Sequence, residues 1–220
     1  MDALIAENIQ RFKSQLSEKV TLVAVSKTKP VSDIREAYEA GHLDFGENRI
    51  QEMVDKYEEL PKDIRWHMIG HVQGNKIKYM APFVHLVHGM DKLKRFKELD
   101  KEAAKNERII DCLVQIHIAE EESKFGFDYE EAWALLEDQP KEKFPSVRIR
   151  GLMGMATLTD DQTQVRNEFK GLRQFYDKVR TELAPADFNI LSMGMSGDFQ
   201  WAVDEGSNMV RIGSAIFGKR

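Results

Sequence analysis

Eight short apolar runs alternate with longer segments of helical period, and this alternation constrains the fold more than any other feature of the chain. The runs are rich in β-branched residues, which is typical of strands, and the segments between them carry one apolar face each. The predicted strands span residues 21–26, 43–46, 65–70, 84–89, 111–118, 149–156, 189–195 and 209–214. A further helix, over residues 2–18, precedes the first of them.

Strict alternation of eight strands with helices predicts an α/β fold, a single (β/α)8 TIM barrel with an extra N-terminal helix. A doubly wound open sheet is the alternative. The strand count favours the barrel, and the G-x-G-x-x-G turn of dinucleotide-binding sheets does not follow the first strand. The chain shows no linker or repeat, so we expect one domain over residues 1–220.

The charge balance and cysteine content restrict the partners and the compartment. The formal net charge is −5 and both signs are scattered along the sequence, whereas nucleic-acid binding needs a concentrated basic face. Cys112 is the only cysteine, which fits a reducing compartment. No run has the length of a membrane span and the first residues do not resemble a signal peptide. We therefore expect a cytoplasmic protein without a nucleic-acid or membrane partner.

The chemistry of a barrel of this kind belongs at the carboxyl ends of its strands. Lys27 follows the first strand directly, in VTLVAVSKTKP. An amine beside apolar walls has a lowered pKa and can attack a carbonyl. After strands seven and eight, Ser196 with Gly197 and Gly213 with Ser214 each pair a hydroxyl with a glycine at a helix start, as in phosphate sites.

A reactive lysine opposite a phosphate site suits a phosphorylated aldehyde. Pyridoxal 5′-phosphate (PLP) is one candidate and a phosphosugar bound as in an aldolase is another. Lys27 could equally be a solvated lysine, and either serine a simple helix cap. Lys124, beyond the fifth strand, is an alternative lysine. His67 and His71 lie at a strand end rather than on one helix face, so we expect no metal site there.

Seven motifs resemble, in the same order along the whole chain, those of the PLP homeostasis proteins, the YggS/PROSC group. They are AVSKTKP, FGENRIQE, WHMIGHVQGNK, ESKFGF, GLMGMA, LSMGMSGDFQWAV and VRIGSAIFG. The resemblance implies a barrel of the alanine-racemase N-terminal type that carries PLP as a Schiff base. This family usually has threonine where the present chain has Ser214, which retains the hydroxyl group.

The resemblance also implies a role for eight cofactor-binding residues. Lys27 would form the Schiff base, and Arg211 would face the pyridine nitrogen. The phosphate would be held by Ser196, Gly213 and Ser214. The remaining residues, which would lie close to the cofactor, are Asn48, Met195 and His67.

The residue expected at the pyridine nitrogen argues against efficient turnover. The electron-withdrawing power of PLP is greatest when that nitrogen is protonated, but an arginine can only donate a hydrogen bond to it. No tyrosine lies in a strand-end motif to act as a second base. We therefore expect no catalytic residue, a monomer that binds PLP and related B6 vitamers, and apo-enzymes as further partners. A PLP-dependent amino-acid racemase or lyase is the alternative function.

Overall fold

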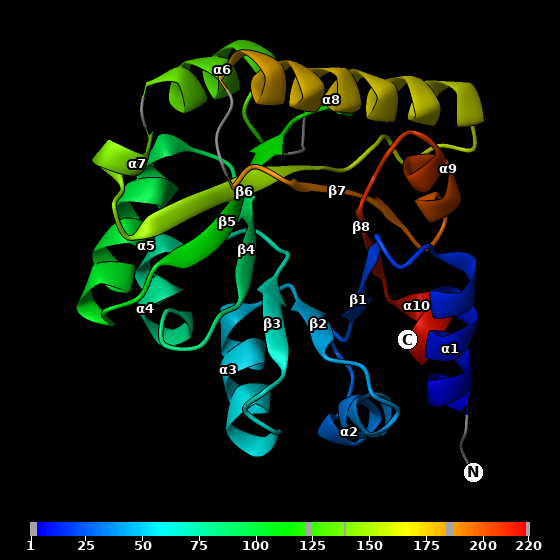
Figure 1. Cartoon of the computed structure of the whole chain (residues 1–220). Coiled ribbons are helices and arrows are strands. Elements are labelled where there is room, and N and C mark those ends of the chain that lie inside the picture. Colours follow the sequence, from blue (N-terminus) through cyan, green and yellow to red (C-terminus); the bar gives the residue numbers. More distant parts are fainter. Residues whose placement is uncertain (1–3, 122–124, 139, 184–186, 219–220) are drawn as a thin grey trace.

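Eight parallel strands form a closed barrel in sequential order (Figure 1). The computed structural model describes residues 4–121, 125–138, 140–183 and 187–218, and the statements below concern these residues. β1 pairs with both β2 and β8, and the pairs Thr21 with Met209 and Ala24 with Ile212 close the ring. The strands are β1 (Thr21–Val25), β2 (Asp44–Glu47), β3 (Arg65–Met68), β4 (Leu86–Met90), β5 (Ile110–Ile116), β6 (Val147–Gly154), β7 (Ile190–Met195) and β8 (Met209–Ile212). The predicted (β/α)8 barrel is confirmed.

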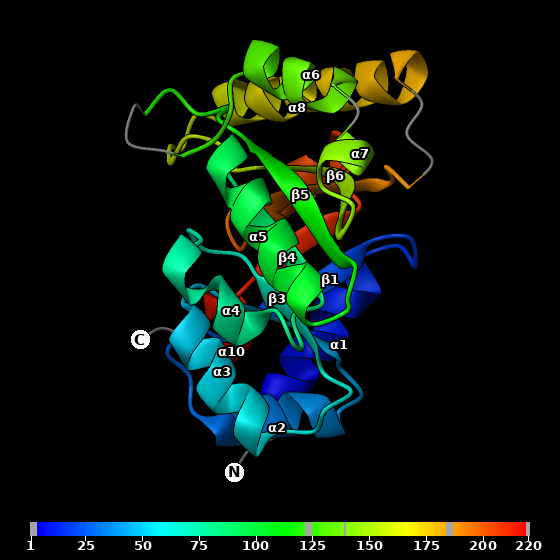
Figure 2. The same cartoon turned by 90° about the vertical axis from the view of Figure 1, so that its left-hand side faces the viewer.

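Helices surround the strands on the outside of the ring. Figures 1 and 2 show α6 and α8 packed together on one side and α1 beside α10 on another. The helices are α1 (Leu4–Gln15), α2 (Val31–Glu39), α3 (Ile50–Glu59), α4 (Ile77–Met80), α5 (Leu93–Lys105), α6 (Tyr129–Glu137), α7 (Pro140–Lys143), α8 (Gln162–Glu182), α9 (Phe199–Asp204) and α10 (Ser214–Phe217), with a 3₁₀ turn, η1 (Gly74–Lys76), before α4. The extra N-terminal helix is therefore present, and it ends at Gln15 rather than at residue 18.

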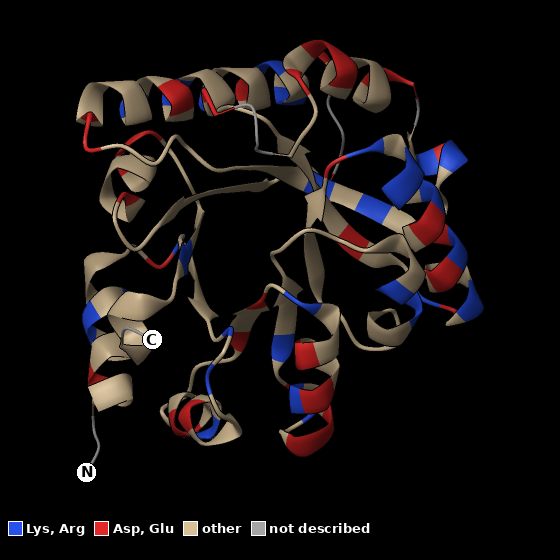
Figure 3. Ribbon diagram, turned by 180° about the vertical axis from the view of Figure 1, so that it is seen from behind, with Lys and Arg blue, Asp and Glu red and all other residues tan. Residues whose placement is uncertain are grey.

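The apolar core has two parts because strand side chains alternate between the faces of the sheet. Most buried apolar residues lie between the strands and the helices. A separate cluster consists of Val23, Leu86, Leu113, Met153 and Met209, which come from five different strands. Acidic and basic residues are mixed on the outer helices (Figure 3). None of the described helices combines the length and the apolar character needed to cross a bilayer.

Strand ends differ from the predictions where the chain turns toward the next helix. β8 ends at Ile212 rather than at residue 214, because Gly213 is the N-cap of α10 and Ser214 its first residue. Two glycines, Gly41 and Gly206, lie just after helix ends. They follow α2 and α9 by two residues and have φ angles of 80° and 95°, in the left-handed region that glycine adopts at such ends.

Candidate functional site

A cavity of about 510 Å³ opens among the carboxyl ends of the strands, and we call it the mouth cavity. Seven of the eight predicted site residues line it together. They are Lys27, Asn48, Met195, Ser196, Arg211, Gly213 and Ser214. The strand-end reasoning therefore brought together residues that lie up to 187 positions apart in the sequence, between Lys27 and Ser214.

The backbone around Lys27 is fixed from both sides. Ser26 is fully buried, and its hydroxyl donates to Glu47 Oε1 at 2.6 Å. The amide of Thr28 donates to Glu52 Oε1 at 2.5 Å, and Thr28 has a φ of 64°, which is unusual for a β-branched residue. Strained backbone of this kind persists only where the surroundings hold it, and it collects at functional sites.

A buried charge cluster lies behind this segment and fixes its position. Lys56 donates to the carbonyl of Ser26 at 2.8 Å, to Glu47 Oε1 at 2.8 Å and to Glu52 Oε1 at 2.7 Å. Burial raises the pKa of Glu47 to about 7, against the opposing effect of Lys56. The end of β1 is thus tied to β2 and α3 through ionic groups that are buried or, in Glu52, partly buried.

Two loops meet at the cavity next to the end of β1, because β8 pairs with β1, and they bring together the residues of the phosphate prediction. The amide of Gly213 donates to Ser196 Oγ at 3.3 Å, so the loop after β7 contacts the start of α10. α10 is held from outside by Asn8, which donates to the Ile216 carbonyl at 2.9 Å, and by Lys29, which donates to the Phe217 carbonyl at 2.7 Å. The amides at the start of a helix have no partner within it and are available to an anion.

The helix caps themselves differ from the sequence interpretation. Asn48 lies just before α3, but Arg49 occupies the N-cap position of that helix and makes no side-chain cap bond. Asp198, not Ser196, precedes α9. Asn48 and Ser196 are therefore free of the capping role that was the alternative explanation for them, and both line the mouth cavity.

A β-bulge places Met195 beside Arg211. The pairing of β7 with β8 shifts between Ser192 and Met195, so that Met195 lies opposite Arg211. Gly194 within the bulge has a φ of 96°, and a Cβ there would lie 2.6 Å from the Cβ of Ala202. An extra residue in one strand re-aims the side chains that follow it, and only glycine fits at this position.

Arg211 is a buried cation whose hydrogen-bond partners are neutral. Its Nη1 donates to Ser192 Oγ at 2.6 Å and its Nη2 to the Gly154 carbonyl at 3.0 Å. No carboxylate lies within ion-pair distance of it in the described ranges. Burial lowers the pKa of Arg211 to about 10. A guanidinium has five N–H donors, so donors remain for an acceptor in the cavity.

Hydrogen bonds continue from Ser192 through the barrel interior. Ser192 Oγ lies 3.2 Å from His88 Nδ1, and His88 Nε2 lies 3.0 Å from His67 Nδ1. His67 Nε2 lies 3.0 Å from Asp44 Oδ1. Because arginine can only donate, the hydroxyl proton of Ser192 is directed to His88, and both imidazoles then donate toward Asp44. Burial lowers the pKa of His88 well below its ordinary value, consistent with a neutral ring.

His67 is the one predicted residue that the structure does not bring into the mouth cavity. It lines a second cavity of about 790 Å³ at the amino ends of the strands, which we call the base cavity. There Arg65 donates to both oxygens of Asp44, at 2.8 and 2.5 Å. The sequence placed His67 at a strand end, but it lies inside β3, where its side chain reaches Asp44 and His88.

The structure also adds residues that the sequence interpretation missed. Gln115, Phe125 and His71 line the mouth cavity. His71 had been considered only as a metal ligand or a structural histidine, and Gln115 lies inside a strand where no motif marks it. Lys124, the alternative lysine, lies outside the described residues.

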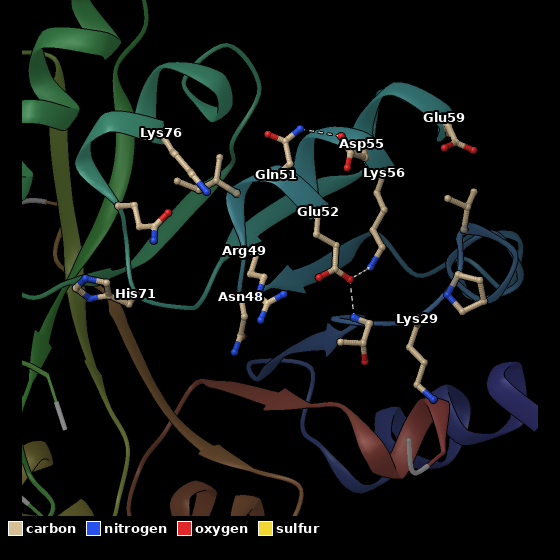
Figure 4. Close-up of a pocket in the computed structure, with 15 residues that line it drawn as sticks. Lys29, Asn48, Arg49, Gln51, Glu52, Asp55, Lys56, Glu59, His71 and Lys76 are labelled. Atoms are coloured by element: carbon tan, nitrogen blue, oxygen red, sulfur yellow. Dashed lines mark hydrogen bonds and ion pairs between the residues drawn. The ribbon is translucent and has the colours of Figure 1, made fainter. Parts of the chain in front are cut away.

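A larger groove of about 1080 Å³ adjoins the mouth cavity along α3 (Figure 4). The two share Thr28, Lys29, Asn48 and His71. In the view of Figure 4, Asn48 and Arg49 lie between His71 and Lys29. Lys27 lines only the smaller cavity, which alone combines an amine, the two serine loops and Arg211. We therefore take the mouth cavity as the candidate site and the groove as its approach.

Comparison with known proteins agrees with this geometry. Residues 2–220 match the family model described as "Alanine racemase, N-terminal domain". A protein of Aquifex aeolicus named "Pyridoxal phosphate homeostasis protein" is 40% identical over 200 residues, which cover 90% of this chain and 86% of the relative. A protein of the same name from Pasteurella multocida is 37% identical over 224 residues, covering 99% and 95%.

Solved structures give the same result. PipY of Synechococcus elongatus, solved without PLP, has a TM-score of 0.92 at 35% identity and covers 97% of this chain and 100% of its own. The same protein with PLP bound has a TM-score of 0.87 at 34% identity, with the same coverage. An alanine racemase of Bartonella henselae shares the fold alone, with a TM-score of 0.74 at 17% identity over 99% of this chain and 60% of its own. The chain belongs to the alanine racemase N-terminal domain family and, within it, to the pyridoxal phosphate homeostasis proteins.

Proposed function

We propose that this chain binds PLP in the mouth cavity, holds it on Lys27 and serves in intracellular PLP homeostasis rather than as an enzyme. The observation that carries the proposal is that one cavity combines a lysine amine, two serine loops and a buried arginine. PLP offers a matching aldehyde, a phosphate and a pyridine nitrogen. PipY, which shares the fold at 34% identity, has been solved with PLP bound.

The residues present fit the cofactor in charge as well as in position. Arg211 is 4% exposed and is held only by a hydroxyl and a carbonyl, so its remaining N–H donors suit the lone pair of a pyridine nitrogen. Ser196, Gly213 and Ser214 would hold the phosphate, where hydroxyl groups and helix-start amides converge. Asn48 and Met195 would line the ring. His67 has no place in this set, because it lies at the base cavity.

The same residues support a binding role over the racemase or lyase alternative. When bound, PLP withdraws electrons from an attached amino acid, most strongly when its ring nitrogen is protonated. Arg211 can only donate to that nitrogen and therefore favours the unprotonated ring. None of the five tyrosines is among the described residues that line the cavity. A phosphosugar aldolase is disfavoured because a sugar offers no acceptor like the pyridine nitrogen.

Lys27→Ala tests the proposal. The purified full chain, mixed with PLP and treated with borohydride, should carry a pyridoxyl group on the peptide that contains Lys27, as read by mass spectrometry. The variant should lose both the label and the absorbance of the lysine-bound cofactor while keeping its far-UV circular dichroism. Lys19→Ala is the matched control, because Lys19 lies at the base cavity. A label that persists in Lys27→Ala and maps to Lys29 or Lys124 would contradict the assignment.

The cellular setting is part of the same proposal. We infer a cytoplasmic monomer that exchanges PLP and related B6 vitamers with PLP-dependent apo-enzymes. The groove that adjoins the mouth cavity supports exchange, since it leaves the Lys27 side of the site open to approach along α3. Size-exclusion chromatography with light scattering, and transfer of PLP to a purified apo-enzyme, check these two statements.

A further inference from the structure

His71 and Asp91 form a histidine–carboxylate pair at the edge of the mouth cavity. His71 Nδ1 lies 3.1 Å from Asp91 Oδ2. The Asp91 side chain is 1% exposed, whereas that of His71 is 34% exposed. A carboxylate on Nδ1 favours the tautomer that carries its proton there, so the lone pair lies on Nε2. Nε2 is then the acceptor nitrogen of a partly exposed ring that lines the mouth cavity.

Asp91 has little else to bind. Neither of its oxygens accepts a hydrogen bond of good geometry from the described residues, although both are buried. A buried carboxylate is costly unless a partner compensates it, and His71 is the only basic side chain within ion-pair distance of Asp91 in the described part of the chain. Among the described residues, the buried carboxylate of Asp91 therefore has one ionisable partner, the imidazole of His71.

The backbone holds this pair in place by close approach of three strand ends. A Cβ on Gly70 would lie 2.3 Å from the carbonyl oxygen of Asn48, and a Cβ on Gly89 would lie 2.5 Å from the carbonyl oxygen of Gly70. Only glycine allows both contacts. His71 follows the first glycine directly and Asp91 follows the second by two residues, so their relative position is set by the packed backbone.

The ring of His71 is also fixed in orientation. Phe125 stacks on it with a centroid distance of 4.4 Å and an interplanar angle of 29°. Gln115 donates to the Phe125 carbonyl at 2.9 Å and thereby holds the stacking partner. All three side chains line the cavity that contains Lys27. A ring held by a carboxylate on one nitrogen and by stacking on its face has the features of a positioned proton acceptor.

We propose that His71, oriented by Asp91, carries the protons exchanged when an aldehyde is attached to Lys27 and when it is released, an inference that rests on the proposed function. Attachment converts the amine and the aldehyde into a C=N bond and one water molecule. The two protons of the neutral amine leave the nitrogen and end on the departing oxygen, and His71 accepts at Nε2 and returns them, so the imidazole is regenerated. Release runs in reverse, with the protons passing from water to the nitrogen.

The role predicts a kinetic effect without a matching effect on affinity. In His71→Ala, the rates of attachment and of release should both fall by about a hundredfold, the lower end of the general acid–base range, because solvent reaches the cavity. Their ratio should stay within about twofold, because a proton carrier lowers the barrier in both directions. Stopped-flow absorbance after mixing the apo-protein with PLP, and after dilution of the loaded protein, measures the two rates.

Three comparisons separate proton transfer from a structural role. Pyridoxine 5′-phosphate has an alcohol in place of the aldehyde and cannot bond to Lys27, so its affinity should be the same in His71→Ala and the parent chain. Added imidazole should restore part of the lost rate in the variant only. His85→Ala, at the base cavity, is the matched control and should behave as the parent.

Unchanged rates in His71→Ala, or a parallel loss of affinity for PLP and pyridoxine 5′-phosphate, would overturn the inference and leave the proposed function standing. Failure of the parent chain to take up a borohydride-fixed label on Lys27 would instead overturn the proposed function. If His71→Ala does not fold, Asp91→Asn serves, since it keeps the shape of the side chain and removes the charge that fixes the tautomer. It should slow both rates, and parental rates would overturn the inference.

Discussion

Strand β2 carries two buried carboxylates three residues apart, and they meet opposite environments. Asp44 lies at the base cavity. Its burial alone would raise its pKa, but the hydrogen bonds from His67 and Arg65 outweigh this and lower it well below the ordinary value of 3.8. Glu47 lies behind Lys27, and there burial prevails over Lys56 and raises the pKa to about 7. β2 thus holds a carboxyl with a lowered pKa, Asp44, at its amino end and one with a raised pKa, Glu47, at its carboxyl end.

The contrast extends to the surroundings of the two cavities. At the base, Arg65 pairs with Asp44 and Arg150 with Asp111, each at ion-pair distance. At the mouth, Arg211 has only neutral partners, and the oxygens of Asp91 lack a well-aligned donor among the described residues. Paired charges stabilise the fold, whereas incompletely matched groups are suited to a ligand that completes them. The paired charges at the base cavity therefore stabilise the fold, and the incompletely paired groups at the mouth cavity are available to a ligand.

Asp44→Ala should break the base and spare the mouth. The variant leaves buried His67 and half-exposed Arg65 without their acceptor, so we expect the free energy of unfolding to fall by about 3 kcal/mol, the lower part of the range for a broken buried pair. Urea denaturation measures the loss. PLP affinity of the folded variant should stay within about twofold of the parent, because Asp44 does not line the mouth cavity and three side chains, Ser192, His88 and His67, separate it from Arg211. A PLP affinity that falls together with the free energy of unfolding would show that the base cavity and the mouth cavity are coupled.

Lys56→Met should lower both the stability of the fold and the retention of PLP in the mouth cavity. It removes the donor to the Ser26 carbonyl and to Glu47, so we expect a loss of about 2 kcal/mol of stability, together with faster release of PLP. The loss should be smaller at pH 6 than at pH 8, because a protonated Glu47 needs no cation. Lys101→Met, on the exposed face of α5, is the control for a lost lysine charge. A parental rate of PLP release in the variant would show that the charge cluster around Lys56 does not influence Lys27.

Glu47→Gln should change chiefly the pH dependence of stability. An unfolded glutamate titrates near 4.5 and the folded one near 7, so the folded protein binds an extra proton between these values. The contribution of Glu47 to stability is therefore full below pH 4.5 and is lost as the pH rises through 7. Urea midpoints recorded from pH 4.5 to 8 should fall less steeply in the variant. Asp44 acts in the opposite sense, and its contribution is lost as the pH falls below 3.8.

The barrel and most of its site could be predicted from the sequence because both depend on local patterns. Eight apolar runs predict the positions of the strands. A residue that directly follows a strand lies at the carboxyl-terminal face of the barrel, and this holds for any residue type. Lys27, Ser196 and Gly213 were found in this way. Helix capping was predicted less well, because Ser196 and Asp198 both lie just before α9 and the backbone conformation places Asp198 at the N-cap.

The residues that could not be predicted act through pairs from distant strands. His67 was predicted to lie close to the cofactor because it stands in a motif. Its side chain instead contacts Asp44 and His88 on the two neighbouring strands and lines the base cavity. The pairing of His71 with Asp91 depends on the close approach of Gly70 to Gly89, which no period in the sequence records. Contacts of this kind appear only when the ring of strands is closed.

α10 has only four residues, and a single helical turn does not maintain itself in water. Its shape is imposed by Asn8 and Lys29, one from the first helix of the chain and the other from the loop after β1. If the start of α10 binds a phosphate, the lifetime of the complex depends in part on Asn8, which lies on the first helix and does not line the mouth cavity. Natural variation at this outlying position would then adjust how long the vitamer is retained without changing a residue of the cavity.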